Sequence, residues 1–117
     1  MKTVRFNQII DAQLGACKDI LRFKAKEYAT EDRLHNFRVA AGLQGVSAKN
    51  ALSGMMAKHT VSIYDMCASE ESFSPELWDE KITDSINYLL LLRALVQEDE
   101  LDKVVVHIPE DPRDSLA

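Results

Sequence analysis

Apolar side chains recur every three or four residues over the first third of the chain, which predicts two amphipathic helices. The first is expected over about residues 7–28. Its apolar face consists of Ile10, Leu14, Cys17, Leu21 and Tyr28. A polar segment interrupts this pattern, and a short second helix is expected from about Leu34 to Gly42 or Gly45, because glycine often ends a helix.

Two longer helices follow, each with a serine at its expected start. Ser47 is a good N-cap for the third helix. The apolar face of that helix consists of Leu52, Met55, Met56, His59, Ile63 and Met66. Ser74 caps a fourth helix, with Pro75 in the first helical position, that runs to about Gln97. The second half of this helix is apolar all round, which predicts that it is buried.

The end of the chain has a different pattern. Residues 103–109 are rich in β-branched side chains and predict a short strand, which Thr3–Phe6 could pair with. We therefore expect an all-α, four-helix bundle-like domain over residues 1–109 with a short extended C-terminal segment. Residues 110–117 are expected to form a flexible tail.

Composition narrows the class of protein. With 117 residues, 46% of them hydrophobic, the chain suits a single domain that folds without a metal or disulfide. Residues 1–69 hold 10 of the 14 basic residues, whereas residues 70–117 hold 13 of the 19 acidic ones. A net charge of −5 argues against non-specific nucleic-acid binding. No apolar run is long enough for a membrane span or a signal peptide. Cys17 and Cys67 are expected to be buried thiols in a reducing, cytoplasmic environment.

Candidate chemistry begins on the fourth helix. Glu80, Asp84 and Asn87 lie within about 60° of one another around its axis, so they form one polar stripe. Because this stripe leads into the apolar half of the helix, we expect it to face the bundle interior or a cleft. Buried carboxylates need a cation, a metal or hydrogen bonds as partners. A solvated face at the start of the helix is the alternative.

The third helix carries a matching stripe of Lys58, Ser62 and Asp65. Lys58 is a candidate partner for the carboxylates of the fourth helix, or for a phosphate as a point charge, and an ordinary surface lysine is the alternative. His59 lies in the middle of the apolar face, where a hydrogen-bonded core residue is a more common outcome than a ligand.

A third cluster spans residues 24–38, at the junction of the first two helices. It offers side chains suited to a phosphate and a base, namely Lys24, Tyr28, Arg33 and Asn36. Arginine binds phosphate oxygens in pairs, an aromatic ring stacks on a base, and a helix N-terminus adds N–H donors. An ordinary polar helix junction would have a similar composition.

Three blocks of sequence resemble a known group of proteins. They are Lys26–Tyr28 with Asp32–Phe37, Gly54–Met66, and Trp78–Tyr88. Over about residues 20–97 the chain resembles small phage-encoded helical proteins of the nucleotide-modification-associated domain group. More distantly, it is similar to the MazG-like all-α nucleotide pyrophosphatases.

The resemblance to MazG-like enzymes implies a magnesium site. Those enzymes hold the metal with an ExxE pair on one helix and an ExxD pair on a later one. Glu80 and Asp84 would stand in for the second pair, and Mg would be the cofactor if the protein is hydrolytic. The position of the first pair has Lys58, Ser62 and Asp65 instead. Exchanging carboxylates for a lysine suits direct binding of an anion better than binding of two metals.

The leading hypothesis is a phage-type protein that binds a nucleotide or nucleotide-derived immune signal and sequesters it without hydrolysis. The resemblance further implies a homo-oligomer in the cytoplasm of an infected bacterial host. One alternative is a magnesium-dependent nucleoside-triphosphate pyrophosphatase, with Glu80 and Asp84 as metal ligands. Another is an inhibitor that contacts a host protein through its acidic half.

Overall fold

The computed structural model describes residues 1–27 and 32–100, except for the side chains of 25–27. Within them the chain forms four helices and no strand: α1 (Thr3–Glu27), α2 (His35–Gln44), α3 (Ala48–Ala68) and α4 (Pro75–Glu100). The predicted all-α fold is therefore confirmed for these residues. The predicted strand over residues 103–109 and the predicted tail lie outside the described part.

The helix ends agree with the local sequence signals. The Ser47 and Ser74 hydroxyls accept hydrogen bonds of 3.1 Å from the backbone N–H groups of Asn50 and Leu77 respectively. These contacts satisfy donors that have no partner inside the helix. Gly45 ends α2 in the left-handed conformation, with φ of 68°.

The N-terminus differs from its prediction. Thr3–Phe6 form the first turn of α1 instead of a strand, and the N–H of Phe6 donates to the carbonyl of Lys2 over 3.1 Å. Four alternating residues are too few to distinguish a strand from one end of a long helix. The prediction that this segment pairs as a strand with residues 103–109 is therefore wrong.

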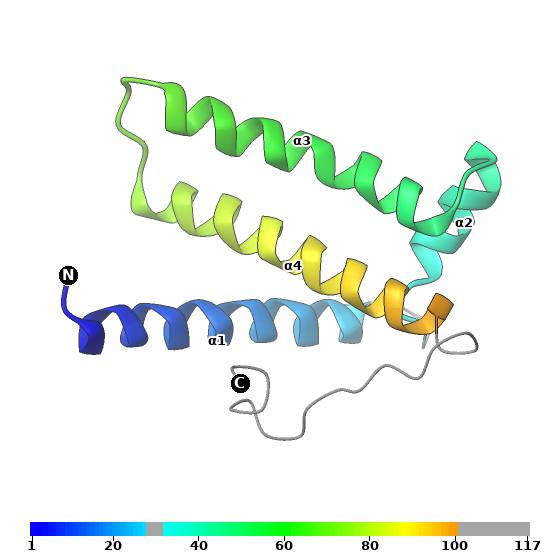
Figure 1. The fold of residues 1–117 in the computed structure, drawn as a ribbon, viewed down its shortest axis with the longest axis horizontal. Coiled ribbons are helices and arrows are strands. Elements are labelled where there is room, and N and C mark those ends of the chain that lie inside the picture. Colours follow the sequence, from blue (N-terminus) through cyan, green and yellow to red (C-terminus); the bar gives the residue numbers. More distant parts are fainter. Residues whose placement is uncertain (28–31, 101–117) are drawn as a thin grey trace.

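The hydrophobic core lies at one end of the molecule. Figure 1 shows α3 and α4 side by side and antiparallel, with α2 across the end where α3 begins and α4 ends. The buried cluster comes from these three helices and from the residue that precedes α2; it consists of Leu34, Phe37, Ala41, Ala48, Ala51, Leu52 and Leu95. Small alanines on α2 and α3 allow these helices to approach closely around Leu52 and Leu95, which are fully buried.

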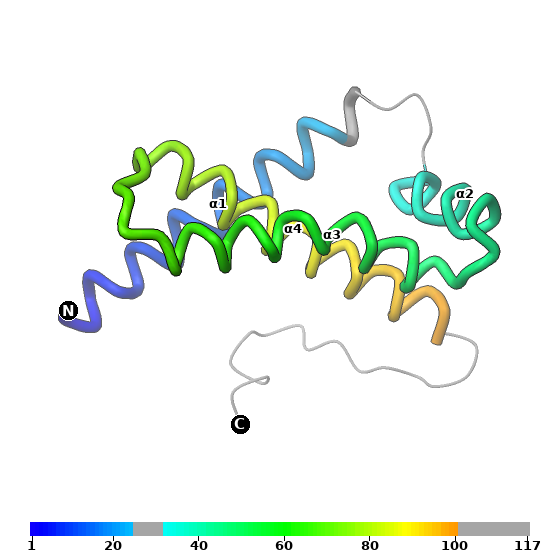
Figure 2. Tube along the Cα trace, turned by 90° about the horizontal axis from the view of Figure 1, so that it is seen from above, coloured from blue at the N-terminus to red at the C-terminus, as the bar shows by residue number. Residues whose placement is uncertain are grey.

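α1 packs on α4 alone among the described helices. Figure 2 shows that α1 crosses α4 instead of running alongside it. The contact includes a hydrogen bond of 2.9 Å from the Gln13 amide to the Thr83 hydroxyl, next to the buried Cys17. Because the crossing covers only a short part of α1, Ile10 and Leu14 remain exposed, contrary to the prediction of one continuous buried face.

Two further predictions of burial are wrong. Leu89 and Leu90 are 54% and 42% exposed, because α1 and α3 cover only part of the surface of α4. The second half of α4 is therefore not enclosed within the described part of the chain. Cys67 is exposed, because Met66 takes the inward position in the last turn of α3. Cys17 is buried as predicted.

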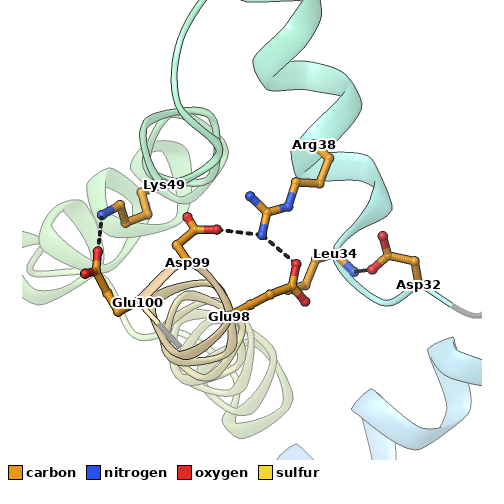
Figure 3. A network of polar contacts seen from close by, with 7 residues as sticks. All are labelled: Asp32, Leu34, Arg38, Lys49, Glu98, Asp99 and Glu100. Carbon is orange, nitrogen blue, oxygen red and sulfur yellow. Dashed lines mark hydrogen bonds and ion pairs between the residues drawn. The ribbon is translucent and has the colours of Figure 1, made fainter. Parts of the chain in front are cut away.

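Ion pairs hold the end of α4 against α2 and α3. Arg38 contacts both Glu98 and Asp99 over 2.7 Å, and Lys49 lies 3.8 Å from Glu100 (Figure 3). These basic side chains offset three carboxylates that would otherwise be unfavourable at the negative end of a helix. The hydrogen bonds to Asp99 and Glu98 raise the pKa of Arg38 above its usual range. The pairs explain why α4 continues three residues beyond the predicted end at Gln97.

Candidate functional site

A cavity of about 190 Å³ lies between the core and α1, and all four helices contribute to its wall. Its apolar lining consists of Ile20, Leu21, Phe37, Met55 and Leu91. Its polar lining consists of Lys24, Arg33, Asn36, His59, Asp84, Asn87 and Tyr88. A cavity of about 150 Å³ is enough for benzene, so this one has room for a single planar ring system.

Asn87 is the most unusual residue of the cavity wall. It is only 6% exposed, and neither its Oδ1 nor its Nδ2 has a hydrogen-bond partner among the described residues. Leaving a buried polar group unpaired costs about 1–3 kcal/mol, and buried amides in folded proteins are normally satisfied. Asn87 therefore brings a buried amide, unpaired among the described residues, to the cavity wall.

His59 of α3 and Asp84 of α4 are neighbours in the wall of the same cavity. Nδ1 of His59 lies 3.9 Å from Oδ2 of Asp84, which is beyond hydrogen-bond distance, and Nδ1 has no other partner in the described part of the chain. The imidazole also packs against the ring of Tyr88, with centroids 4.9 Å apart and planes tilted by 39°. The wall thus combines an aromatic surface with a carboxylate and an unpaired ring nitrogen.

Basic side chains occupy the side of the cavity where α1 ends and α2 begins. Lys24 belongs to the exposed surface of α1, and Asn36 is exposed in the first turn of α2. Arg33 is half-buried, and its Nη2 donates a hydrogen bond of 3.2 Å to the carbonyl of Leu21. This contact holds the guanidinium against the backbone of α1 at the cavity wall, on the same side as the exposed Lys24, and cations on such a surface attract an anion from solvent.

The structure brings together five of the residues predicted from sequence. Lys24, Arg33, Asn36, Asp84 and Asn87 all line the cavity, although they come from three separate parts of the chain. Periodicity placed Asp84 and Asn87 on one face of α4, and composition pointed to residues 24–38. Sequence patterns do not show that these two regions meet.

Other predicted residues lie elsewhere. Lys58 and Glu80 are exposed and do not line the cavity. Ser62 lines a shallow hollow nearer the turn between α3 and α4, beside Phe73 and Lys81. Tyr28 lies outside the described residues.

Two important cavity residues were not selected from sequence. His59 was assigned to the core, and Tyr88 was not singled out. Tyr88 follows Asp84 by four residues, so both occupy neighbouring positions on one face of α4. That spacing was the signal available for Tyr88, whereas His59 required knowledge of how α3 faces α4.

The donor set of this cavity does not fit the magnesium site implied by the MazG-like resemblance. Magnesium prefers several hard oxygen ligands in octahedral geometry. Asp84 is the one carboxylate among the described residues that line the cavity, and its neighbours include a histidine, a lysine and an arginine. Across residues 1–24 and 32–100, no group of three or more His, Cys, Asp or Glu side chains is arranged to hold a metal ion.

Comparisons with known proteins identify no relative of this chain. No protein-family model, curated protein sequence or solved structure matches the chain. In the part of the chain that the structure describes, no helix combines the length and apolar character needed to cross a membrane.

Proposed function

We propose that this chain binds a nucleotide or nucleotide-derived molecule, with the base in the cavity and the phosphate at its basic opening. The observation that carries the proposal is the buried, unpaired amide of Asn87 at the cavity wall. An apolar ligand would leave both of its polar atoms unsatisfied. A nucleobase offers the donors and acceptors that the amide lacks, and its flat ring fits the volume.

Charge sets the orientation of the ligand. Asp84 lines the cavity three positions before the buried Asn87, and a carboxylate there would repel a phosphate. Lys24 and Arg33 lie where α1 ends and α2 begins, where they would attract one. The base therefore enters first and the phosphate stays near solvent.

Shape supports the same orientation. The ring of Tyr88, already in contact with His59, provides an aromatic surface, and Phe37 and Met55 complete an apolar wall. Aromatic and thioether side chains pack well against flat ring systems. In this proposal Tyr88 stacks on the base, a role for which Tyr28 was the candidate from sequence.

We propose binding without turnover, as in sequestration of a nucleotide signal. The mismatch between the cavity and a magnesium site supports this choice over pyrophosphatase activity. Incubation with nucleoside triphosphates and magnesium tests it, because intact triphosphates are expected. Steady release of pyrophosphate, lost in Asp84→Ala, would support the enzyme instead.

The homo-oligomer also remains a proposal. In this proposal the interface between copies covers exposed apolar side chains, such as Phe6 and Leu14 on α1 and Leu89 on α4, which are about half exposed. Sedimentation velocity measures the state directly. A single species with the mass of two or more chains is the expected result, and a monomer at all concentrations would contradict it.

Isothermal titration calorimetry with nucleosides and their 5′-monophosphates tests the binding proposal. Lys24→Ala should weaken nucleotide binding about two- to fivefold, the usual effect of an exposed ion pair, and leave nucleoside binding unchanged. Lys18→Ala is the matched control, because Lys18 is exposed on the same helix outside the cavity. Absence of heat or thermal shift with every linear and cyclic nucleotide would refute the proposal.

A further inference from the structure

We propose that the base selected by this cavity is guanine, recognised by Asp84 and Asn87. The inference rests on the proposed function, since it assumes that the base enters the cavity. Both residues line the cavity from α4, three positions apart and on one face of the helix. They can therefore contact neighbouring atoms of one ligand edge.

Asp84 determines which edge of a nucleobase can bind here. An ionised carboxylate has only acceptors, two oxygens side by side, so its best partner presents two adjacent N–H donors. Among the standard bases, guanine alone has such a pair on its pairing edge, in N1–H and the 2-amino group. Asp84 lines the cavity, and its Oδ2 lies 3.9 Å from His59 Nδ1, too far for a hydrogen bond between the two.

Asn87 supplies the complementary donor. The next group along the guanine edge is the O6 acceptor, and the unpaired Nδ2 of Asn87 is a donor in need of an acceptor. Its Oδ1 is left for a water. From O6 to the 2-amino group, the guanine edge thus presents one acceptor and two donors. Asn87 offers the matching donor, and Asp84 offers the two matching acceptors.

The other bases place an acceptor against the carboxylate. Adenine and cytosine each have a ring nitrogen acceptor beside their amino group, and uracil has a carbonyl on both sides of its single N–H. Each would bring a lone pair towards Asp84, which is a repulsive contact. Discrimination of this kind is strong, because a mismatched base loses hydrogen bonds and also meets a repulsive contact.

Calorimetry with four 5′-monophosphates tests the assignment. Wild-type protein should bind guanosine monophosphate at least about tenfold more tightly than inosine monophosphate, which lacks the 2-amino donor. It should bind adenosine monophosphate more weakly again, and xanthosine monophosphate hardly at all, because its C2 carbonyl faces Asp84.

Asp84→Asn provides a change of preference that a merely damaged protein cannot produce. The new amide offers a donor for the xanthine C2 carbonyl and an acceptor for N1–H. We expect at least about a tenfold loss of affinity for guanosine monophosphate and a gain for xanthosine monophosphate. Asp79→Asn is the matched control, because Asp79 is exposed on α4 outside the cavity. It should retain the wild-type preference.

The outcomes separate the two proposals. Equal affinity of the wild type for guanosine, inosine and adenosine monophosphates would overturn the guanine assignment while supporting a nucleotide site. A folded Asp84→Asn protein that gains nothing for xanthosine monophosphate would also overturn it. Failure of every nucleotide to bind would remove the proposed function itself.

Discussion

The side chains of Gln13 and Thr83 form a hydrogen bond of 2.9 Å, whereas the side chain of Asn87, one turn further along α4, is also buried and has no hydrogen-bond partner among the residues that the structure describes. The two α4 residues belong to the same face and differ in what lies opposite. Thr83 meets α1 at the helix crossing. Asn87 meets the cavity instead, so the molecule leaves a polar group unsatisfied where a ligand could enter.

Asn87→Leu should separate stability from binding. Removing an unpaired buried amide relieves an unfavourable burial of about 1–3 kcal/mol, so the free energy of unfolding should stay level or rise. Nucleotide binding should be lost. Urea denaturation followed by fluorescence of Trp78, together with calorimetry, measures both quantities on the same sample.

Thr83→Val is the comparison for that variant, because it removes a buried polar group that is satisfied. Unfolding should become easier by about 1 kcal/mol, since the Gln13 amide loses its acceptor, and nucleotide binding should persist. If Asn87→Leu destabilises the protein as much as Thr83→Val does, the amide has a structural partner and the binding account fails.

Leu52→Ala should be the most damaging type of core substitution. Leu52 is fully buried where α2, α3 and α4 meet, so truncation leaves a void and should lower the free energy of unfolding by about 2–5 kcal/mol. Leu43→Ala on α2 should change it by less than about 0.5 kcal/mol, because Leu43 is 84% exposed. Similar effects of the two substitutions would contradict the location of the core.

Arg38→Gln removes both ion pairs between α2 and the end of α4. The loss should be about 1 kcal/mol at low salt and smaller at high salt, since these pairs are partly exposed and are screened by ions. Thermal unfolding at two salt concentrations measures it. A loss that salt does not reduce would show that Arg38 acts through packing.

The raised pKa of Arg38 also fixes the pH dependence of this contribution. A cation with a higher pKa in the folded state adds stability that is complete below its unfolded pKa and lost only as pH rises through the folded pKa. Both values lie far above neutral pH. The difference between wild type and Arg38→Gln should therefore stay constant from about pH 7 to about pH 9. A difference that shrinks over that interval would contradict this cause.

Two glycine substitutions should change the stability of the protein in opposite directions. Gly45→Ala should destabilise the protein by about 1 kcal/mol, because φ of 68° is unfavourable for a residue with a Cβ. Gly54→Ala should stabilise it by about 0.5–1 kcal/mol, because Gly54 lies inside α3 and its added Cβ meets open space. Thermal melts of both variants test the pair, and a stabilising Gly45→Ala would rule out the left-handed helix end.

Local sequence signals predicted the four helices well. Ser47 and Ser74 cap helices as expected, and a glycine ends α2. Burial was harder to predict, because it depends on how helices cross. The apolar pattern predicts that the leucines in the second half of α4 are buried. Leu89 and Leu90 are nevertheless exposed, because no described helix covers that side.

The candidate site was only partly predictable for the same reason. Asp84 and Asn87 share a helical face, so periodicity groups them. Whether Lys24 or Lys58 joins them depends on the positions of α1 and α3, and the structure places Lys24 at the cavity and Lys58 outside it. His59 looked like a core residue because an apolar face gives no sign of a cavity beside it.

Chemical-shift mapping by NMR, during titration with guanosine monophosphate, tests the central claim most directly. The side-chain amide signals of Asn87 and the methyl signal of Met55 should shift together and saturate, because both groups line the cavity. Signals from Phe73 and Ser62, in the hollow near the turn between α3 and α4, should stay in place. Shifts confined to that hollow, or an unchanged Asn87 amide at saturating nucleotide, would contradict the account.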